Sequence, residues 1–158
     1  MTKLMDEKWP IIEGTHGMRS QMLNSLSDAD LAYNPGGENV TLGEVWRELG
    51  EIEKAYIDSV KTFKQDFNYR NPEAGLEKSV TKLKAWFEAL DNEFKTALAA
   101  LSDDDAKKTI ARASGFQPAV ELQLDIYLQA LLIFFGKTSV YYRAMGKPLP
   151  ENFKEWFG

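Results

Sequence analysis

Apolar residues recur at intervals of three and four along most of the chain, a spacing that places them on one face of a helix. The clearest stripe comprises Leu76, Val80, Leu83, Phe87, Leu90, Phe94, Leu98 and Leu101. Residues 42–67 repeat the pattern, residues 12–26 carry a shorter version, and residues 118–145 carry the most apolar one. No segment alternates apolar and polar residues over a useful length. We therefore expect four helices and regard strands as improbable.

Polar residues that can satisfy free backbone amides mark where two helices begin. Thr41 and Glu44 form a T-x-x-E capping box, in which each side chain accepts a hydrogen bond from the other residue's backbone. Ser102 and Asp105 repeat that spacing and predict a short helix that continues to Arg112.

Proline and glycine mark the other boundaries. Asn71 is expected to cap the third helix, with Pro72 in its first turn, where a missing N–H costs nothing. Pro118 is expected to open the fourth helix, and Gly146 to end it.

These elements predict an all-α, single-domain four-helix bundle over residues 1–158, of the antiparallel type, with one extra short helix between helices three and four. An aromatic tail follows, in which Phe153, Trp156 and Phe157 recur at helical spacing. We expect this tail to fold back on the bundle or to meet a second subunit, because an exposed aromatic cluster would promote association.

Composition narrows the classes of function. The chain has 24 acidic and 19 basic residues, a formal charge of −5, and its lysines are interspersed with acids. Nucleic acid is therefore not an expected partner, because its binding needs clustered basic residues. The N-terminal residues lack the apolar core of a signal peptide, and no apolar run approaches the ~20 residues of a membrane span. We expect a cytoplasmic protein with no membrane partner.

The supply of metal ligands and nucleophiles is small. The chain has no cysteine and one histidine, His16, so thiolate sites, histidine-rich zinc sites and nucleophilic triads are excluded. His16 is expected to be a packed or half-exposed side chain, with a general base as the sharper alternative. Glu44, Glu48 and Glu51 share one flank of the second helix and indicate either a solvated face or a site for a hard cation.

Several motifs, taken together and in order, resemble the DinB-like superfamily of four-helix-bundle proteins. The stretch TLGEVWRELGEIE at residues 41–53 resembles that family's second helix, and LSDADLAYNP at residues 26–35 resembles its connection between helices one and two. Gly136, Tyr141, Arg143, Gly146 and Pro150 are similar to the end of its last helix. The resemblance covers nearly the whole chain and implies the DinB-like bundle fold.

In that family a metal is usually held by one histidine from helix two and two from helix four. Placed in register, these three positions fall on Glu48, Ala130 and Phe134, and Lys137 stands where the family has glutamine. Alanine and phenylalanine cannot bind a metal. We therefore expect no metal and no cofactor, and the resemblance then does not imply the family's metal-dependent activities, such as thiol transfer and maleylpyruvate isomerisation.

The same positions suggest a remnant of the family's site. We expect a remnant pocket formed by Glu48, Tyr127, Ala130, Phe134, Lys137 and Tyr141. Phe134 would fill the volume of the missing imidazoles. A carboxylate beside the bundle interior needs a partner, so we hypothesise that Glu48 pairs with Lys137; the alternative is that Glu48 turns out to solvent.

Three functions remain open. The first is a non-enzymatic homodimer that binds a small apolar or amphipathic ligand. The second is a metal-independent enzyme that uses Glu48, Lys137, His16 or Tyr141 as acid–base groups. The third is an interaction protein, which a pocket plugged by Phe134 would favour. Gly136, a weak helix former in mid-helix, indicates a place where another helix or a ligand approaches closely.

Overall fold

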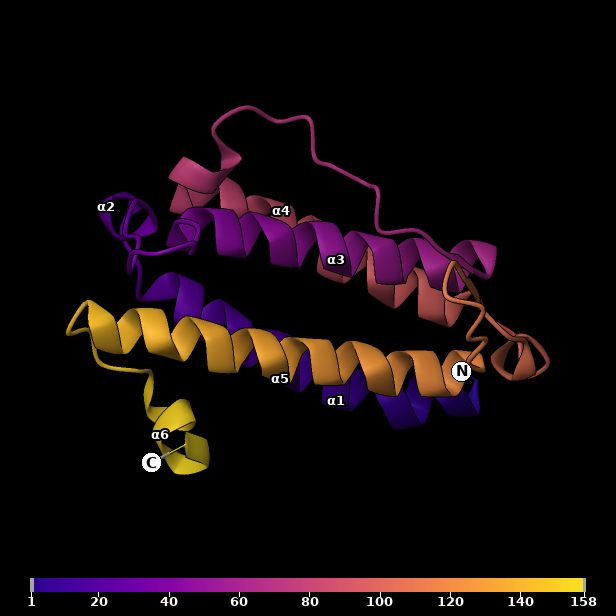
Figure 1. Cartoon of the computed structure of the whole chain (residues 1–158). Coiled ribbons are helices and arrows are strands. Elements are labelled where there is room, and N and C mark those ends of the chain that lie inside the picture. The colour runs from indigo at the N-terminus through magenta and orange to yellow at the C-terminus, as the bar shows by residue number, and fades with distance from the viewer. Residues whose placement is uncertain (1, 158) are drawn as a thin grey trace.

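The computed structural model describes residues 2–157, with side chains through Glu155. Four long helices form the bundle: α1 (Lys3–Asn24), α3 (Leu42–Thr62), α4 (Val80–Ala99) and α5 (Val120–Ala144). Figure 1 shows α3 and α4 in one layer and α1 and α5 in the other. The expected all-α four-helix bundle is therefore confirmed.

Shorter elements fill the connections between the long helices. These are α2 (Asp28–Leu31), η1 (Leu76–Lys78), η2 (Asp105–Lys107) and the C-terminal α6 (Glu151–Phe157). The extra short helix between helices three and four is present as the single 3-10 turn η2. It is shorter than predicted, because residues 111 and 112 form a strand instead.

Two short strands contradict the expectation of a strand-free chain. β1 (Lys64–Gln65) pairs in parallel with β2 (Ala111–Arg112). The second helix was predicted to reach residue 67, but α3 ends where Phe63 adopts the left-handed conformation, with φ of 57°. The turn redirects the chain into β1, so the apolar Phe67 lies in a loop. Strands this short leave no alternation in the sequence to recognise.

The short connections predicted from the sequence implied that neighbouring helices run antiparallel throughout. This expectation is wrong for α3 and α4. Residues 63–79 arch over the bundle and return the chain to the end at which α3 begins, so α3 and α4 run parallel (Figure 1). The backbone of Glu77 lies beside Gly43 at the start of α3, and a Cβ on that glycine would sit 1.8 Å from the Glu77 carbonyl oxygen. One long crossover is a known variant of the four-helix bundle.

The predicted helix boundaries are partly right. Thr41 and Glu44 form the expected capping box, with the Thr41 N–H donating to the Glu44 carboxylate at 2.7 Å. Ser102 and Asp105 bond in the same way around η2. The prediction that Asn71 caps the third helix is wrong, because Ser79 caps α4 and Asn71 instead accepts a hydrogen bond from the Glu73 N–H.

The C-terminal aromatic tail folds back on the bundle. Phe153 is fully buried, and its ring lies edge-on to Phe135 with the centroids 5.1 Å apart. The side chains of Trp156 and Phe157 lie outside the described part of the structure. Among the described residues, no helix is long and apolar enough to cross a membrane.

Candidate functional site

Phe134 occupies the position where the resemblance places a metal ligand. Its side chain is 7% exposed and packs against the fully buried Trp46, with the two ring centroids 4.8 Å apart in an edge-to-face arrangement. This geometry is a favourable aromatic contact. Aromatic rings thus fill the space between α3 and α5 at this level of the bundle.

Glu48 and Lys137 lie at the surface above that aromatic contact. The Lys137 ammonium is 3.4 Å from a Glu48 carboxylate oxygen, and the side chains are 45% and 59% exposed respectively. The hypothesised approach of the two groups is therefore present, in a solvated form. An ion pair of this kind contributes little free energy, because water screens it.

A hollow of about 420 Å³ adjoins Glu48, lined by Glu48, Glu51, Ile52, Phe67 and Arg70. Two of its walls come from the crossover loop and not from α5. The expected pocket residues Tyr127 and Lys137 do not line it.

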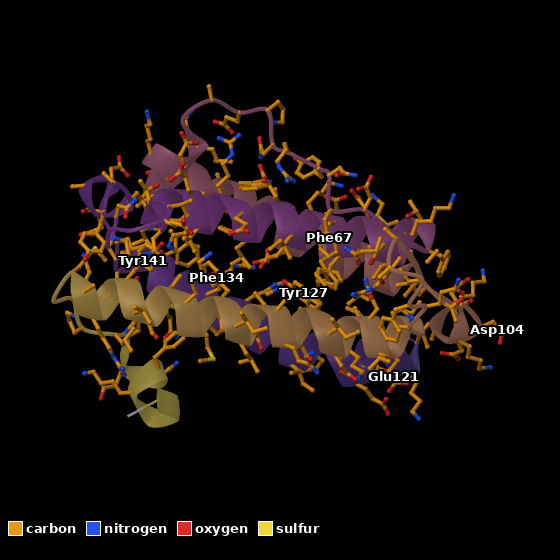
Figure 2. All side chains as sticks on the ribbon, in the orientation of Figure 1. Phe67, Asp104, Glu121, Tyr127, Phe134 and Tyr141 are labelled. Atoms are coloured by element: carbon orange, nitrogen blue, oxygen red, sulfur yellow. The ribbon has the colours of Figure 1, made fainter. Side chains whose placement is uncertain are left out.

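The two tyrosines of the expected pocket have other roles. Figure 2 shows Tyr127, Phe134 and Tyr141 along the side of α5 that faces α3. The Tyr141 hydroxyl donates to the backbone oxygen of Val40 at 2.8 Å and so fastens the loop before α3. Tyr127 is fully buried and belongs to a separate polar cluster, described below.

The residues at the three family positions do not fit a metal. Ala130 and Phe134 carry no donor atom, and the Phe134 ring fills the volume beside Trp46. Glu48 alone offers oxygen ligands, and it faces solvent beside Lys137. One exposed carboxylate does not make a transition-metal site, which needs three or more ligands.

A buried polar cluster at mid-bundle is the feature that the sequence reading missed. Each of the four long helices contributes to it, and its members are His16 and Arg19 from α1, Glu53 from α3, Asp91 from α4 and Tyr127 from α5. Four of the five side chains are buried, and the Asp91 side chain is 29% exposed. Asp91 is therefore the point at which the cluster meets solvent.

Arg19 holds this buried cluster together. Its guanidinium donates to both Glu53 oxygens, at 2.7 and 2.9 Å, and to both Asp91 oxygens, at 2.8 Å each. Such paired contacts fix the orientation of the groups as well as adding energy. One arginine on α1 therefore ties α3 and α4 together across the core.

His16 joins the cluster from the other side. Its Nε2 lies 2.5 Å from the Tyr127 hydroxyl, and its Nδ1 lies 2.7 Å from Asp91 Oδ1. The order hydroxyl, imidazole, carboxylate is that of a hydrolase triad. Because the Tyr127 hydroxyl is sealed inside the bundle, this arrangement serves packing and not attack on a substrate. His16 is thus a packed histidine, one of the two states expected from the sequence.

The charges of the cluster shift its ionisation. Burial works against the Asp91 carboxylate, but the His16 contact and the Arg19 charge outweigh it and lower the Asp91 pKa. Burial also works against Arg19, yet Glu53, Tyr127 and Asp91 together raise its pKa. Burial and the Glu53 charge raise the Tyr127 pKa well above its usual value, so its phenol stays protonated.

His16, Glu53 and Asp91 present ligand atoms within 4.8 Å of one another, a separation compatible with a metal ion. Arg19 already supplies positive charge to both carboxylates. A divalent ion there would have to break four charge-assisted hydrogen bonds. The cluster thus fits its own arginine better than a metal.

The sequence did contain a signal for this cluster. Glu53 and Asp91 lie on or beside the apolar stripe near the middle of their helices, and Arg19 lies beside that of α1, nearer its C-terminal end. Charged residues in such positions are almost never fully buried unless they are paired. Reading those interruptions together would have predicted a charged core.

Comparison with solved structures places the fold among DinB-like helical bundles. The chain is similar to a DinB-like protein from Bacillus subtilis, with a TM-score of 0.68 and 14% identity over 85% of this chain and 90% of that one. It is also similar to a mycothiol-dependent maleylpyruvate isomerase, with a TM-score of 0.64 and 16% identity. That match covers 84% of this chain and 61% of the isomerase.

No family model and no curated protein sequence matches the chain. At these identities the structural likeness shows the fold alone. The DinB-like fold implied by the resemblance is therefore confirmed.

Proposed function

We propose that this chain is a DinB-fold interaction protein, which acts as a homodimer and without the metal centre of its fold family. The observation that carries the proposal is the position of Phe134, whose buried ring packs against Trp46 where the family has metal ligands. An aromatic plug removes both the ligands and the space that a metal and its substrate would need. What is left for function is the surface of the bundle.

The metal-independent enzyme is the weaker candidate. Acid–base catalysis by a Lys–Glu pair needs a desolvated site, where neighbouring charges can shift the pKa values of the catalytic groups. Glu48 and Lys137 are about half exposed, at 3.4 Å from each other. Both groups are therefore solvated, and the pair lacks the desolvated surroundings that such catalysis needs.

Metal loading tests the plugged site directly. The purified chain, incubated with zinc or nickel and then dialysed, should retain far less than one equivalent by elemental analysis. The matched control is the Glu48→Ala chain, which should retain the same trace amount. One equivalent that survives dialysis and disappears in Glu48→Ala would contradict the metal-free proposal.

A small amphipathic ligand is a second candidate, supported by the hollow beside Glu48. Its volume of about 420 Å³ lies in the range of small-molecule sites, and it combines Ile52 and Phe67 with charged groups. The anionic dye 8-anilinonaphthalene-1-sulfonate is a suitable probe. Its fluorescence should fall with Phe67→Ser and stay unchanged with Phe116→Ser, which removes another half-exposed ring. Equal responses to the two substitutions would count against this site.

A further inference from the structure

The outward face of α5 is unusually apolar for a solvent-exposed helix surface. Ile133 is 73% exposed and Val140 is 60% exposed, and Leu122 and Leu132 are each more than 40% exposed. Figure 1 shows this helix at the front of its layer, with α1 behind it and α3 alongside it in the other layer. Exposed apolar residues that gather on one face of a helix are typical of an interaction surface.

The strip has the spacing of a helix–helix seam. Steps of four and three residues connect Leu122, Ile126, Gln129, Ile133, Gly136, Val140 and Arg143, and Leu132 flanks this row one turn before Gly136. We call these eight residues the α5 seam. Such a repeat keeps one stripe facing a second helix along its length. From first to last member the seam is about 32 Å long, at 1.5 Å per residue.

Gly136 is a gap in the α5 seam. A Cβ added there would meet no atom within 4 Å, so nothing in the bundle approaches this glycine. The expectation of a close neighbour is therefore wrong within the subunit. A glycine on an outer helix face lowers helix stability by about 1 kcal/mol relative to alanine, and it leaves a hollow that a side chain of another helix can enter.

We propose that the α5 seam binds the α5 seam of a second copy of this chain, antiparallel and about a two-fold axis that crosses the outward face of α5 at the level of residue 134. The inference rests on the proposed homodimer and identifies its interface. An axis at this point relates positions that are equally far from residue 134 along the helix. Leu132, two positions before it, then faces the gap at Gly136 of the partner subunit, two positions after it.

The same two-fold axis also brings opposite charges together at the two ends of the seam. Asp125 lies nine positions before residue 134 and Arg143 lies nine positions after it, both on the same flank of the helix. The antiparallel arrangement therefore brings Arg143 to Asp125 of the partner subunit. Arg143 has no ion pair or hydrogen bond with any side chain that the structure describes.

Asp125 remains available for that contact. It bonds to Lys8 at 2.7 Å, yet its side chain is 42% exposed, and the neighbouring Glu121 is 61% exposed. Two carboxylates and one lysine leave net negative charge at this end of α5. The face is thus complementary to itself in shape and in charge, which is what a two-fold interface requires.

The absence of cysteine makes disulfide trapping a clean test. In the Ile133→Cys chain the two thiols would lie next to the axis, so mild oxidation of a dilute sample should give a disulfide-linked dimer in high yield. Ala89→Cys on the exposed face of α4 is the matched control, because α4 lies across the bundle from α5 (Figure 1). It should stay reduced under the same conditions.

Charge substitutions provide a second test of the proposed dimer interface. Ile133→Glu should raise the dimer dissociation constant at least 10-fold and leave circular dichroism unchanged, whereas Ala89→Glu should do neither. Arg143→Glu should weaken the dimer, and Arg143→Glu combined with Asp125→Arg should restore part of the loss.

The outcomes separate the two proposals. A wild-type chain that is monomeric at every concentration would overturn both the homodimer and its interface. A dimeric wild type whose Ile133→Cys chain stays reduced, and whose Ile133→Glu chain stays dimeric, would keep the homodimer and overturn the α5 seam. Trapping at position 133 without trapping at position 89 supports both.

Discussion

Arg19 donates to both carboxylate oxygens of Glu53, at 2.7 and 2.9 Å, and each of the two side chains is 1% exposed. A buried pair of this kind often gains little over an apolar replacement of both partners, but removing one partner leaves an uncompensated charge. The pair also sets the relative position of α1 and α3, because both oxygens are bound. Its energetic consequences can be measured.

Arg19→Met removes the cation from the buried cluster and leaves the Glu53 carboxylate without its cationic partner. We expect the free energy of unfolding to fall by roughly 3–5 kcal/mol. Urea denaturation followed by circular dichroism measures the change. The control is Lys107→Met, whose side chain is 78% exposed in its pair with Asp104 and which should leave the urea midpoint nearly unchanged. Equal midpoints for the two variants would contradict a structural role for Arg19.

Asp91 should make the fold sensitive to acid. Its folded-state pKa is lowered from 3.8, so its contribution is fully present above about pH 3.8 and is lost as the pH falls through the lower folded-state pKa. Asp91→Asn should be less stable at neutral pH and should lose less stability on acidification below pH 3.8. Urea midpoints measured from pH 6 to about pH 2 test this.

Asp103→Asn is the matched control for that acid titration. Asp103 is exposed in the turn after α4, outside the buried cluster. The urea midpoint of the Asp103→Asn chain should fall with decreasing pH in the same way as that of the wild type. If the urea midpoint of Asp91→Asn falls with decreasing pH as steeply as that of the wild type, Asp91 is not the group that makes the fold sensitive to acid.

Gly43 should not tolerate a side chain. A Cβ there would lie 1.8 Å from the backbone oxygen of Glu77, which the crossover loop holds in place. We expect Gly43→Ala to destabilise the fold by roughly 1–3 kcal/mol through overpacking. Gly14→Ala, in the middle of α1 with no atom within 4 Å of the added Cβ, should instead stabilise it by about 0.5–1 kcal/mol. Thermal melts of the two variants should shift in opposite directions, and a shared direction would contradict the close approach.

Phe134 should behave as a core residue. Phe134→Ala would leave a cavity beside Trp46 and lower the free energy of unfolding by about 3–5 kcal/mol. Phe116→Ala, which removes a ring that is 50% exposed, should have a much smaller effect in the same urea titration. A tolerated Phe134→Ala would indicate an open site in place of an aromatic plug.

Much of the fold could be predicted from the sequence, because apolar residues recur at intervals of three and four along an amphipathic helix. The stripe from Leu83 to Leu98 lies in α4, and the Thr41 box starts α3 as predicted. The end of α3 could not be predicted in this way, since apolar residues such as Phe67 continue the helical spacing beyond it. The left-handed Phe63 and the β1–β2 pairing break the helix through contacts with residues far along the chain.

The candidate site was predicted less well, for a similar reason. The hypothesised approach of Glu48 and Lys137 is present at 3.4 Å, because both residues belong to helices with clear patterns. Tyr127 was assigned to the same pocket, but its direction depends on the packing of four helices. Its contact with His16, 111 residues away in sequence, is a property of the tertiary structure alone.

The most direct test of the association claim is the molar mass of the wild-type chain in solution. Size-exclusion chromatography with light scattering, run over a range of loading concentrations, separates the two possibilities because the subunit mass is 17.9 kDa. We expect a mass of twice 17.9 kDa, with a shift toward the subunit mass only on dilution. A single mass of 17.9 kDa at every concentration, up to about 100 μM, would contradict it.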